Sequence, residues 1–257
     1  MKAQKTLTIM PCLDMMKGRV VKGVNFVDIK DAGDPVECCK AYCAAGADEI
    51  AMLDITATVE SRATMLEVVR KVADVKTVPF TMGGGISSVA AAEAVLKAGA
   101  DKISTSSAVF RNPDMIGDMI KAFGADKVTV AIDVAQNAAM KSGYEVFIDG
   151  GRTATGTDAI EFGKRALGMG ATSLLPTSKS TDGARTGFDL PLIRQFRAIA
   201  PEADIVASGG AGTMEHFAEA AEAGANILLG ASVFHFHLIG IPELKKFLAD
   251  KGFTVSI

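Results

Sequence analysis

The sequence has little of what marks the more specialised classes of protein. It contains no tryptophan, and only four of its 257 residues are cysteine. These cysteines form no CxxC pair and have no histidine cluster beside them, so we expect neither disulfides nor a zinc site. Reduced thiols are usual in a reducing compartment, which favours a cytoplasmic protein. We also expect the protein to work without a metal or other cofactor.

The chain also lacks a strong charge of one sign and any long apolar run. Its formal net charge is −3, so bulk electrostatics give no argument for nucleic acid or a membrane surface as a partner. No apolar stretch is long enough to cross a bilayer, and the N-terminus has no signal-peptide core. With 49% hydrophobic and 22% charged residues, the composition is that of an ordinary globular protein.

Eight short apolar runs alternate with amphipathic stretches of helical length. This alternation is typical of βαβ units in a parallel sheet, and eight units in this length favour a closed (β/α)8 barrel of the TIM type. An open dinucleotide-binding sheet is the alternative, but no GxGxxG motif follows the first run. We expect strands at residues 6–13, 49–54, 78–82, 102–106, 127–133, 173–178, 204–208 and 226–230. We expect helices at residues 34–46, 64–73, 88–99, 112–124, 158–170, 189–200 and 213–224, and a small hairpin at 143–151.

The two halves of the chain resemble each other. Residues 97–110, for example, match residues 222–234, and the matching segments lie roughly 120–126 residues apart, which indicates a repeat of half the chain. We therefore expect a single domain, residues 1–257, built from half-barrel repeats of about 1–124 and 125–257. Two separate domains would show the same similarity, but no linker divides the halves.

Two aspartates end apolar runs at equivalent places in the repeat. Asp14 follows the first expected strand and leads into an expected loop of basic residues that includes Lys22, and Asp133 ends the fifth strand. Functional groups of such barrels sit at the carboxyl ends of the strands, so we expect the two carboxylates to face each other across the mouth. Such a pair suits general acid/base catalysis, whereas either residue alone would as readily be a helix cap or a surface charge. Asp182, after the sixth strand, could be a base, a ligand-orienting group or a cap.

Each half also supplies a glycine-rich turn and a turn of small residues. These are MGGGI and STSSAV in the first half, and SGGAG and LGASV in the second. Backbone N–H groups at such turns bind phosphate, and glycine lets the ligand approach closely. One such turn could be no more than a tight connection. Two symmetry-related pairs favour a small-molecule substrate with a phosphate at each end.

Taken together, these motifs resemble one family over most of the chain. The chain is similar to HisF, the cyclase subunit of imidazole glycerol phosphate synthase in histidine biosynthesis, from about residue 7 to the C-terminus. The similarity is carried by PCLDMMKGRVVKGVNF, DAGDPVE, LDITAT, GGGI, GADKIS, VAIDV, TSKSTDGARTGFD, ASGGAG and ASVFHF. The sister isomerase family, HisA, is also a half-barrel repeat, but GVNF, DAGDPVE and ASVFHF resemble the cyclase.

The resemblance implies a lyase that uses ammonia to convert phosphoribulosyl-formimino-AICAR-phosphate (PRFAR) to imidazole glycerol phosphate and AICAR. It implies that Asp14 and Asp133 are the catalytic acid and base. It assigns substrate and phosphate binding to Lys22, Gly85, Ser106, Ser107, Asp182, Gly183, Gly210, Ala231 and Ser232. The family usually has Asn-Thr where this chain has Ser106-Ser107, and charged residues where it has Ser180 and Thr181.

The resemblance also implies a partner, a HisH-like glutaminase subunit that docks on the N-terminal face of the barrel. Ammonia from that partner would pass through the barrel to the mouth. The matching inlet positions are Thr8, Glu49, Thr81, Lys102 and Ser173. The family has four charged residues around the inlet, and Thr8 and Ser173 replace two of them here. We therefore expect a wider or differently gated ammonia inlet.

Two other functions stay open on the sequence alone. A related ammonia-dependent cyclase of another pathway, for example surface-sugar synthesis, could use the same site on a similar phosphorylated substrate. A non-catalytic barrel that only binds a partner is the second alternative. The intact Asp14, Asp133 and glycine turns argue against it.

Overall fold

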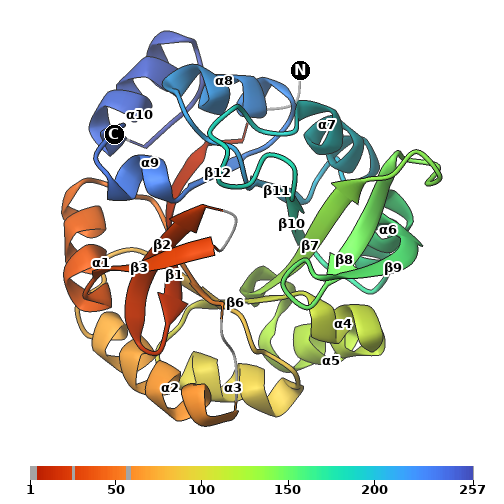
Figure 1. Cartoon of the computed structure of the whole chain (residues 1–257), viewed down its shortest axis with the longest axis horizontal. Coiled ribbons are helices and arrows are strands. Elements are labelled where there is room, and N and C mark those ends of the chain that lie inside the picture. The colour runs from red at the N-terminus through yellow and green to blue at the C-terminus, as the bar shows by residue number, and fades with distance from the viewer. Residues whose placement is uncertain (1–4, 25–26, 56–58, 257) are drawn as a thin grey trace.

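Eight parallel strands close into a barrel (Figure 1). The computed structural model describes residues 5–24, 27–55 and 59–256, and their side chains except at 22–30 and 59–62. The barrel strands are β1 (Thr8–Met16), β4 (Ile50–Asp54), β5 (Phe80–Gly83), β6 (Lys102–Thr105), β7 (Val128–Gln136), β10 (Ser173–Ser178), β11 (Asp204–Ala207) and β12 (Ile227–Gly230). They neighbour one another in chain order, and pairing of β12 with β1 closes the ring. All eight expected strands are present, so the predicted barrel is confirmed.

Helices surround the barrel on the outside (Figure 1). They are α1 (Pro35–Ala44), α2 (Val59–Ala73), α3 (Val89–Lys97), α4 (Ser107–Arg111), α5 (Asp114–Phe123), α6 (Ala159–Gly168), α7 (Leu190–Ile199), α8 (Met214–Glu222), α9 (Ser232–His235) and α10 (Ile241–Asp250), with a 3-10 turn, η1, at Ala125–Lys127. The seven expected helices are all present, whereas α4, α9 and α10 were not among the predicted helices. Asp34, Asp158 and Asp189 accept hydrogen bonds from first-turn N–H groups of α1, α6 and α7, which explains where these helices begin.

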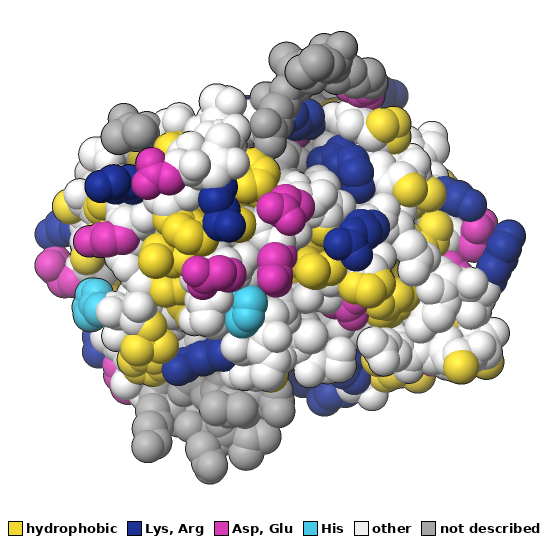
Figure 2. Space-filling model, turned by 90° about the horizontal axis from the view of Figure 1, so that it is seen from above, with side chains coloured by type: hydrophobic (Ala, Val, Ile, Leu, Met, Phe, Trp, Pro, Cys, Tyr) yellow, Lys and Arg dark blue, Asp and Glu magenta, His cyan; other side chains and the backbone are white. Residues whose placement is uncertain are grey.

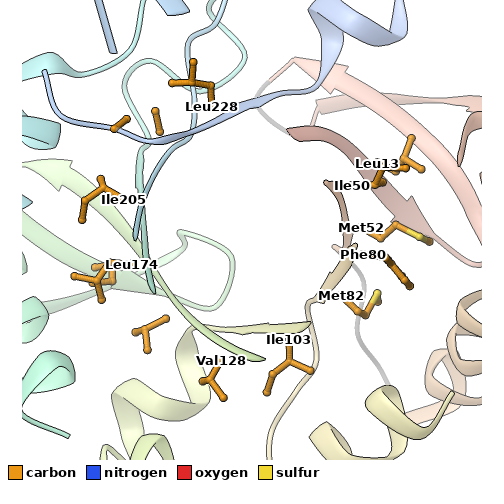
Figure 3. Close-up of a cluster of buried hydrophobic side chains, with 14 of the residues drawn as sticks. Leu13, Ile50, Met52, Phe80, Met82, Ile103, Val128, Leu174, Ile205 and Leu228 are labelled. Carbon is orange, nitrogen blue, oxygen red and sulfur yellow. The ribbon is translucent and has the colours of Figure 1, made fainter. Parts of the chain in front are cut away.

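Side chains of the barrel strands alternate between two separate cores. In β4, Ile50 and Met52 pack outward against the helices, while Ala51 faces the barrel interior. Figure 3 shows the outer layer as a ring of apolar side chains around the strands. The interior layer is smaller and consists of Met10, Cys12, Ala51, Leu175, Val206, Ile227 and Leu229. Burying one large side chain of the outer layer contributes about 1.5–3 kcal/mol, so this layer stabilises the fold while the strand ends stay available for function.

Two hairpins extend from strands at the same mouth of the barrel (Figure 1). The pair β8 (Tyr144–Ile148) and β9 (Thr153–Asp158) follows β7, close to the hairpin expected at 143–151. The pair β2 (Arg19–Val24) and β3 (Val27–Gly33) follows β1. Each hairpin lies next to one of the two barrel strands that carry the catalytic candidates.

The first hairpin corrects an expectation. The basic residues after Asp14 led us to expect a loop, and this was wrong, because Arg19 begins a strand that pairs back onto β1. Lys17 and Gly18 form the turn, with φ angles of 50° and 79°. Two positive φ angles are typical of a two-residue hairpin turn, so Lys-Gly between apolar runs was a signal for this hairpin.

Charges of both signs are mixed on the side of the molecule that carries α8 and α10. Figure 2 looks onto this side and shows acidic and basic side chains interspersed with apolar ones. This face therefore does not present a field of one sign that would steer a polyanion. Among the described residues, no helix is both long and apolar enough to span a bilayer.

Candidate active site

Asp14 and Asp133 lie on opposite walls of the barrel mouth. Asp14 lies two residues beyond Cys12 of the interior layer, and Asp133 lies two residues beyond Ala131, which packs against that layer, so both side chains are on the inner face. Three strands separate β1 from β7 in either direction around the ring. The barrel thus sets the two carboxyl groups across the mouth from each other, as the half-chain repeat led us to expect.

Asp133 has the surroundings of a proton-transfer group. It is half-buried, with Phe147 of β8 and Thr177 of β10 beside it in register. Burial raises the pKa of Asp133 to about 6, nearby Asp182 also raises it, and Lys179 acts in the opposite direction. A carboxyl group with this pKa is partly protonated near neutral pH, so it can both give and take a proton.

Asp14 lies above the apolar interior of the barrel. Its Oδ1 is 3.8 Å from the Sγ of Cys12, a weak donor whose residue is 1% exposed. Beyond Cys12, the interior layer continues with Met10 and Ala51. This apolar layer separates the carboxyl groups at the mouth from the polar groups at the other end of the barrel.

The first expected phosphate loop lies after β5 and β6. Gly84 and Gly85 have φ angles of 88° and 64°, and a Cβ on Gly84 would lie 2.1 Å from a carbonyl oxygen of β4. Only glycine fits this close crossing. Ser106 and Ser107 lead into α4, and the Ser107 Oγ accepts a hydrogen bond from the N–H of Asp149 at 2.8 Å. The Ser107 hydroxyl keeps its own proton, which it can donate to an anion.

The second expected phosphate loop gathers three segments that are distant in the sequence. Residues 180–189 after β10 lie against the glycine turn after β11, where Gly187 donates its N–H to the Gly210 carbonyl at 2.8 Å. Ala231 and Ser232 lead into α9. The three segments therefore converge at one side of the mouth.

Within this group, residues 180–189 carry the charged side chains. Asp182 belongs to this segment and is close enough to Asp133 to raise its pKa. Gly183 follows with a φ angle of 74° and is exposed. Arg185 joins the segments, because its Nε donates to the Ser232 Oγ at 3.2 Å.

Lys22 lies in β2, in register with Lys30 of β3. Its side chain lies outside the described residues, so its expected contact with substrate stays a prediction. Its backbone belongs to the hairpin that extends from β1 beside Asp14.

The expected ammonia inlet lies at the opposite end of the barrel. Glu49 is 4% exposed and accepts hydrogen bonds from the Thr81 Oγ1 at 2.5 Å and the Lys102 Nζ at 2.6 Å. On β7 and β10, the Thr129 Oγ1 donates to the Ser173 Oγ at 3.0 Å. One side of the inlet is thus held by an ion pair and another by two hydroxyl groups.

A cavity of about 220 Å³ joins this inlet to the barrel interior. Its polar wall includes Glu49, Lys102 and Ser173, and its apolar wall includes Met10 and Leu175. Four of the five expected inlet residues line it, Glu49, Thr81, Lys102 and Ser173. Thr8 is not among its lining residues.

Three residues of these sites were missed by sequence reasoning. Thr129 faces Ser173 at the inlet, Lys179 lies near Asp133, and Arg185 contacts Ser232. Lys179 and Arg185 lie three residues to either side of Asp182, which was the one available signal. A lone basic residue in a loop is most often a solvated charge, so this spacing alone did not single them out.

The chain matches a family model described as histidine biosynthesis protein over residues 8–240. It is 47% identical over 249 residues to imidazole glycerol phosphate synthase subunit HisF of Salinispora tropica, covering 96% of this chain and 97% of that protein. It is 46% identical over 251 residues to the protein of the same name from Mycobacterium tuberculosis, covering 96% and 94%. This chain belongs to the HisF family. The resemblance drawn from its motifs is confirmed, and a cyclase of another pathway is not favoured.

Membership of the HisF family agrees with the geometry of the mouth. The fold that the motifs implied is the one present, with Asp14 and Asp133 on opposed strands. The HisF relatives are named as subunits of imidazole glycerol phosphate synthase.

Proposed function

We propose that this HisF chain is the cyclase subunit of imidazole glycerol phosphate synthase, a lyase of histidine biosynthesis. It converts PRFAR and ammonia to imidazole glycerol phosphate, AICAR and water. The observation that carries the proposal is the mouth itself, where two opposed carboxyl groups, Asp14 and Asp133, lie between two glycine-lined turns. A substrate with a phosphate at each end fits that order of groups.

The phosphates fix the substrate across the mouth. One phosphate binds at Gly85, Ser106 and Ser107, where backbone N–H groups and hydroxyl groups are available as donors. The other binds at the turns that hold Gly183, Gly210, Ala231 and Ser232. Anchoring both ends brings the reacting centre over the carboxyl groups without further ordering, which lowers the entropic part of the barrier.

The two aspartates divide the proton transfers. Asp133, with its pKa raised to about 6 by burial, holds a proton that it can give to the departing AICAR group. Asp14 then takes the proton released as ammonia adds and the imidazole ring closes. Asp182 supports this division, because its charge favours the protonated form of Asp133.

Ammonia reaches the mouth from the other end of the barrel. We propose that a glutaminase subunit docks on that N-terminal face and delivers ammonia into the cavity. The apolar interior around Met10 and Cys12 passes a neutral molecule and excludes charged ones. With Thr8 and Ser173 in place of charges, the Glu49–Lys102 ion pair closes only part of the inlet, so the isolated chain admits ammonia from solution.

The free thiols of the chain support a cytoplasmic location, where its phosphorylated substrate would also be found. We further propose that residues 1–257 act as one domain in this reaction. Each half then supplies one carboxyl group and one phosphate loop to a single site.

Turnover by the isolated chain tests this function. PRFAR is supplied with ammonium salt at pH 8, and loss of substrate absorbance is followed together with formation of both products. Conversion to imidazole glycerol phosphate and AICAR in equal amounts supports the cyclase. A folded chain that binds PRFAR but converts none of it, alone or with a glutaminase subunit, would contradict the proposal.

A further inference from the structure

The segment after β10 is fixed against the neighbouring glycine turn by close backbone contacts. A Cβ on Gly210 would lie 2.0 Å from the Gly187 carbonyl oxygen, and one on Gly212 would lie 2.1 Å from that of Arg185. Such contacts are possible only between glycine and backbone. The backbone of Arg185 is therefore held at the edge of the second phosphate loop.

Arg185 has a backbone conformation that its side chain does not favour. Its φ angle is 58°, in the left-handed region. Glycine adopts this region freely, and an arginine there is disfavoured. The turn alone would be better served by glycine, so the contribution of arginine comes from its side chain.

The guanidinium group of Arg185 is held in a defined place. Its Nε donates to the Ser232 Oγ at 3.2 Å, and its Cζ lies 5.8 Å from the centre of the Phe236 ring. The Phe236 side chain is one of the large apolar groups left exposed, at 49%. A hydroxyl group and a ring face together orient the guanidinium in advance of any ligand.

The positive charge of this guanidinium lies at the proposed phosphate site. Arg185 forms no ion pair with a carboxylate among the described residues, whereas Arg19 and Arg111 each pair with an aspartate. Its hydrogen-bond partner, Ser232, belongs to the proposed phosphate site. The charge is thus placed at a group of residues already suited to an anion.

We propose that Arg185 is a substrate-binding residue that contacts the phosphate held by the turns after β10 and β11. The inference rests on the proposed function of that site. Backbone N–H groups and the Ser232 hydroxyl supply neutral donors, and Asp182 adds a negative charge in the same segment. The planar guanidinium supplies the missing positive charge and can donate two hydrogen bonds to one phosphate.

Replacement of Arg185 by methionine tests the proposal in the intact chain. Loss of a charge-assisted hydrogen bond to phosphate corresponds to an increase of about tenfold or more in KM for PRFAR. The kcat changes little, because the contact is equally strong in substrate and transition state. R185K keeps the positive charge but loses the planar pair of guanidinium donors, so its KM lies between those of R185M and the original chain.

A matched control is available on the outside of the barrel. Arg165 in α6 also lies over a phenylalanine ring, with its Cζ 5.4 Å from the centre of the Phe162 ring. R165M removes the same kind of contact far from the mouth and should leave KM unchanged. R185G removes the side chain and relieves the left-handed backbone, so it should raise KM as R185M does without lowering the melting temperature.

Binding of inorganic phosphate, measured by calorimetry, separates this proposal from the proposed function. Phosphate should bind the original chain at two sites, and R185M should weaken one of them about tenfold or more while sparing the other. An unchanged phosphate affinity and KM in R185M and R185G would overturn the role of Arg185. Weakened phosphate binding without any PRFAR turnover by the original chain would uphold it and contradict the cyclase function instead.

Discussion

At the scale of single residues, two charged neighbours act on the pKa of Asp133. Asp182 raises it and Lys179 lowers it. The Lys179 Nζ lies 3.8 Å from the centre of the Phe147 ring and hydrogen-bonds the Gly151 carbonyl. Phe147 is the β8 partner of Asp133, so the hairpin beside Asp133 fixes the position of this lysine.

The pH dependence of turnover should therefore respond to Lys179. If Asp133 acts as the acid, kcat/KM falls as the pH rises through its pKa, because the protonated form is lost. Lys179 favours the carboxylate, so K179M raises the pKa of Asp133 further and moves this fall to higher pH. The profile is measured with ammonium salt, correcting for the fraction present as ammonia. K246M, at an exposed position of α10, serves as the control. An identical pH profile for K179M and K246M would rule out this coupling.

At the same scale, Asp189 joins three elements through one buried carboxylate. It caps α7 by accepting from the Leu192 N–H at 3.2 Å, and it accepts from the Tyr144 hydroxyl at 2.6 Å and the Ser178 hydroxyl at 2.9 Å. It is 8% exposed. The carboxylate thus holds α7, the β8 strand and the end of β10 together beneath residues 180–189.

Removing this carboxylate should lower the free energy of unfolding by more than removing an ordinary helix cap does. D189A should lower the free energy of unfolding by about 2–4 kcal/mol, because a cap is lost and two buried hydroxyl groups lose their acceptor. D34A, which removes the exposed cap of α1 and an exposed ion pair with Arg19 at 3.7 Å, should cost about 1 kcal/mol. Urea unfolding of both variants measures the difference. Equal losses would show that the contacts to Tyr144 and Ser178 add nothing.

At the scale of elements, the inlet combines β4, β5 and β6 through Glu49. This carboxylate is buried and is paired with Lys102, whose side chain is 29% exposed. Removal of the lysine leaves the Glu49 charge inside the barrel with the Thr81 hydroxyl as its remaining partner among the described residues. The strand ends at the inlet are therefore coupled by electrostatics rather than by apolar packing.

K102M should lower the free energy of unfolding by about 2 kcal/mol, less than a fully buried pair would lose, because Lys102 reaches solvent. The exposed α3 pair Lys97–Glu93 provides the control, and K97M should cost under about 0.5 kcal/mol. The double variant E49Q/K102M should recover part of the loss, since no charge then stays buried. Chemical denaturation measures the free energy of unfolding of all three variants. If K102M is no less stable than K97M, the coupling is refuted.

The elements that the sequence predicted are those with a clear period. The eight strands follow from short apolar runs, and the seven helices follow from apolar residues at helical spacing and from caps such as Asp34 and Asp158. The hairpin of β2 and β3 was missed because its basic residues suggested a loop. At the site, Asp14, Asp133 and the glycine turns were found because the repeat places them. Lys179 and Arg185 were not, because their positions depend on contacts with Phe147 and Ser232 that only the folded chain creates.

At the scale of the whole molecule, the barrel is arranged around one axis with different chemistry at its two ends. Opposed carboxyl groups and the proposed phosphate loops lie at the mouth, and the cavity lined by Glu49 and Lys102 opens at the other end. In the proposed function, the apolar layer between them separates the substrate from the ammonia source. We infer that the half-barrel repeat is what gives the mouth two equivalent carboxyl groups and two equivalent loops.

The most direct measurement is turnover of PRFAR with ammonium salt by D14N, D133N and the original chain. Asparagine keeps the shape of each side chain and removes its ability to exchange a proton. The account predicts that both variants bind PRFAR with near-original affinity and lose turnover by about 10²–10⁴-fold each. A variant that is folded, binds PRFAR and still turns it over at the original rate would contradict the claim that Asp14 and Asp133 are the acid and base.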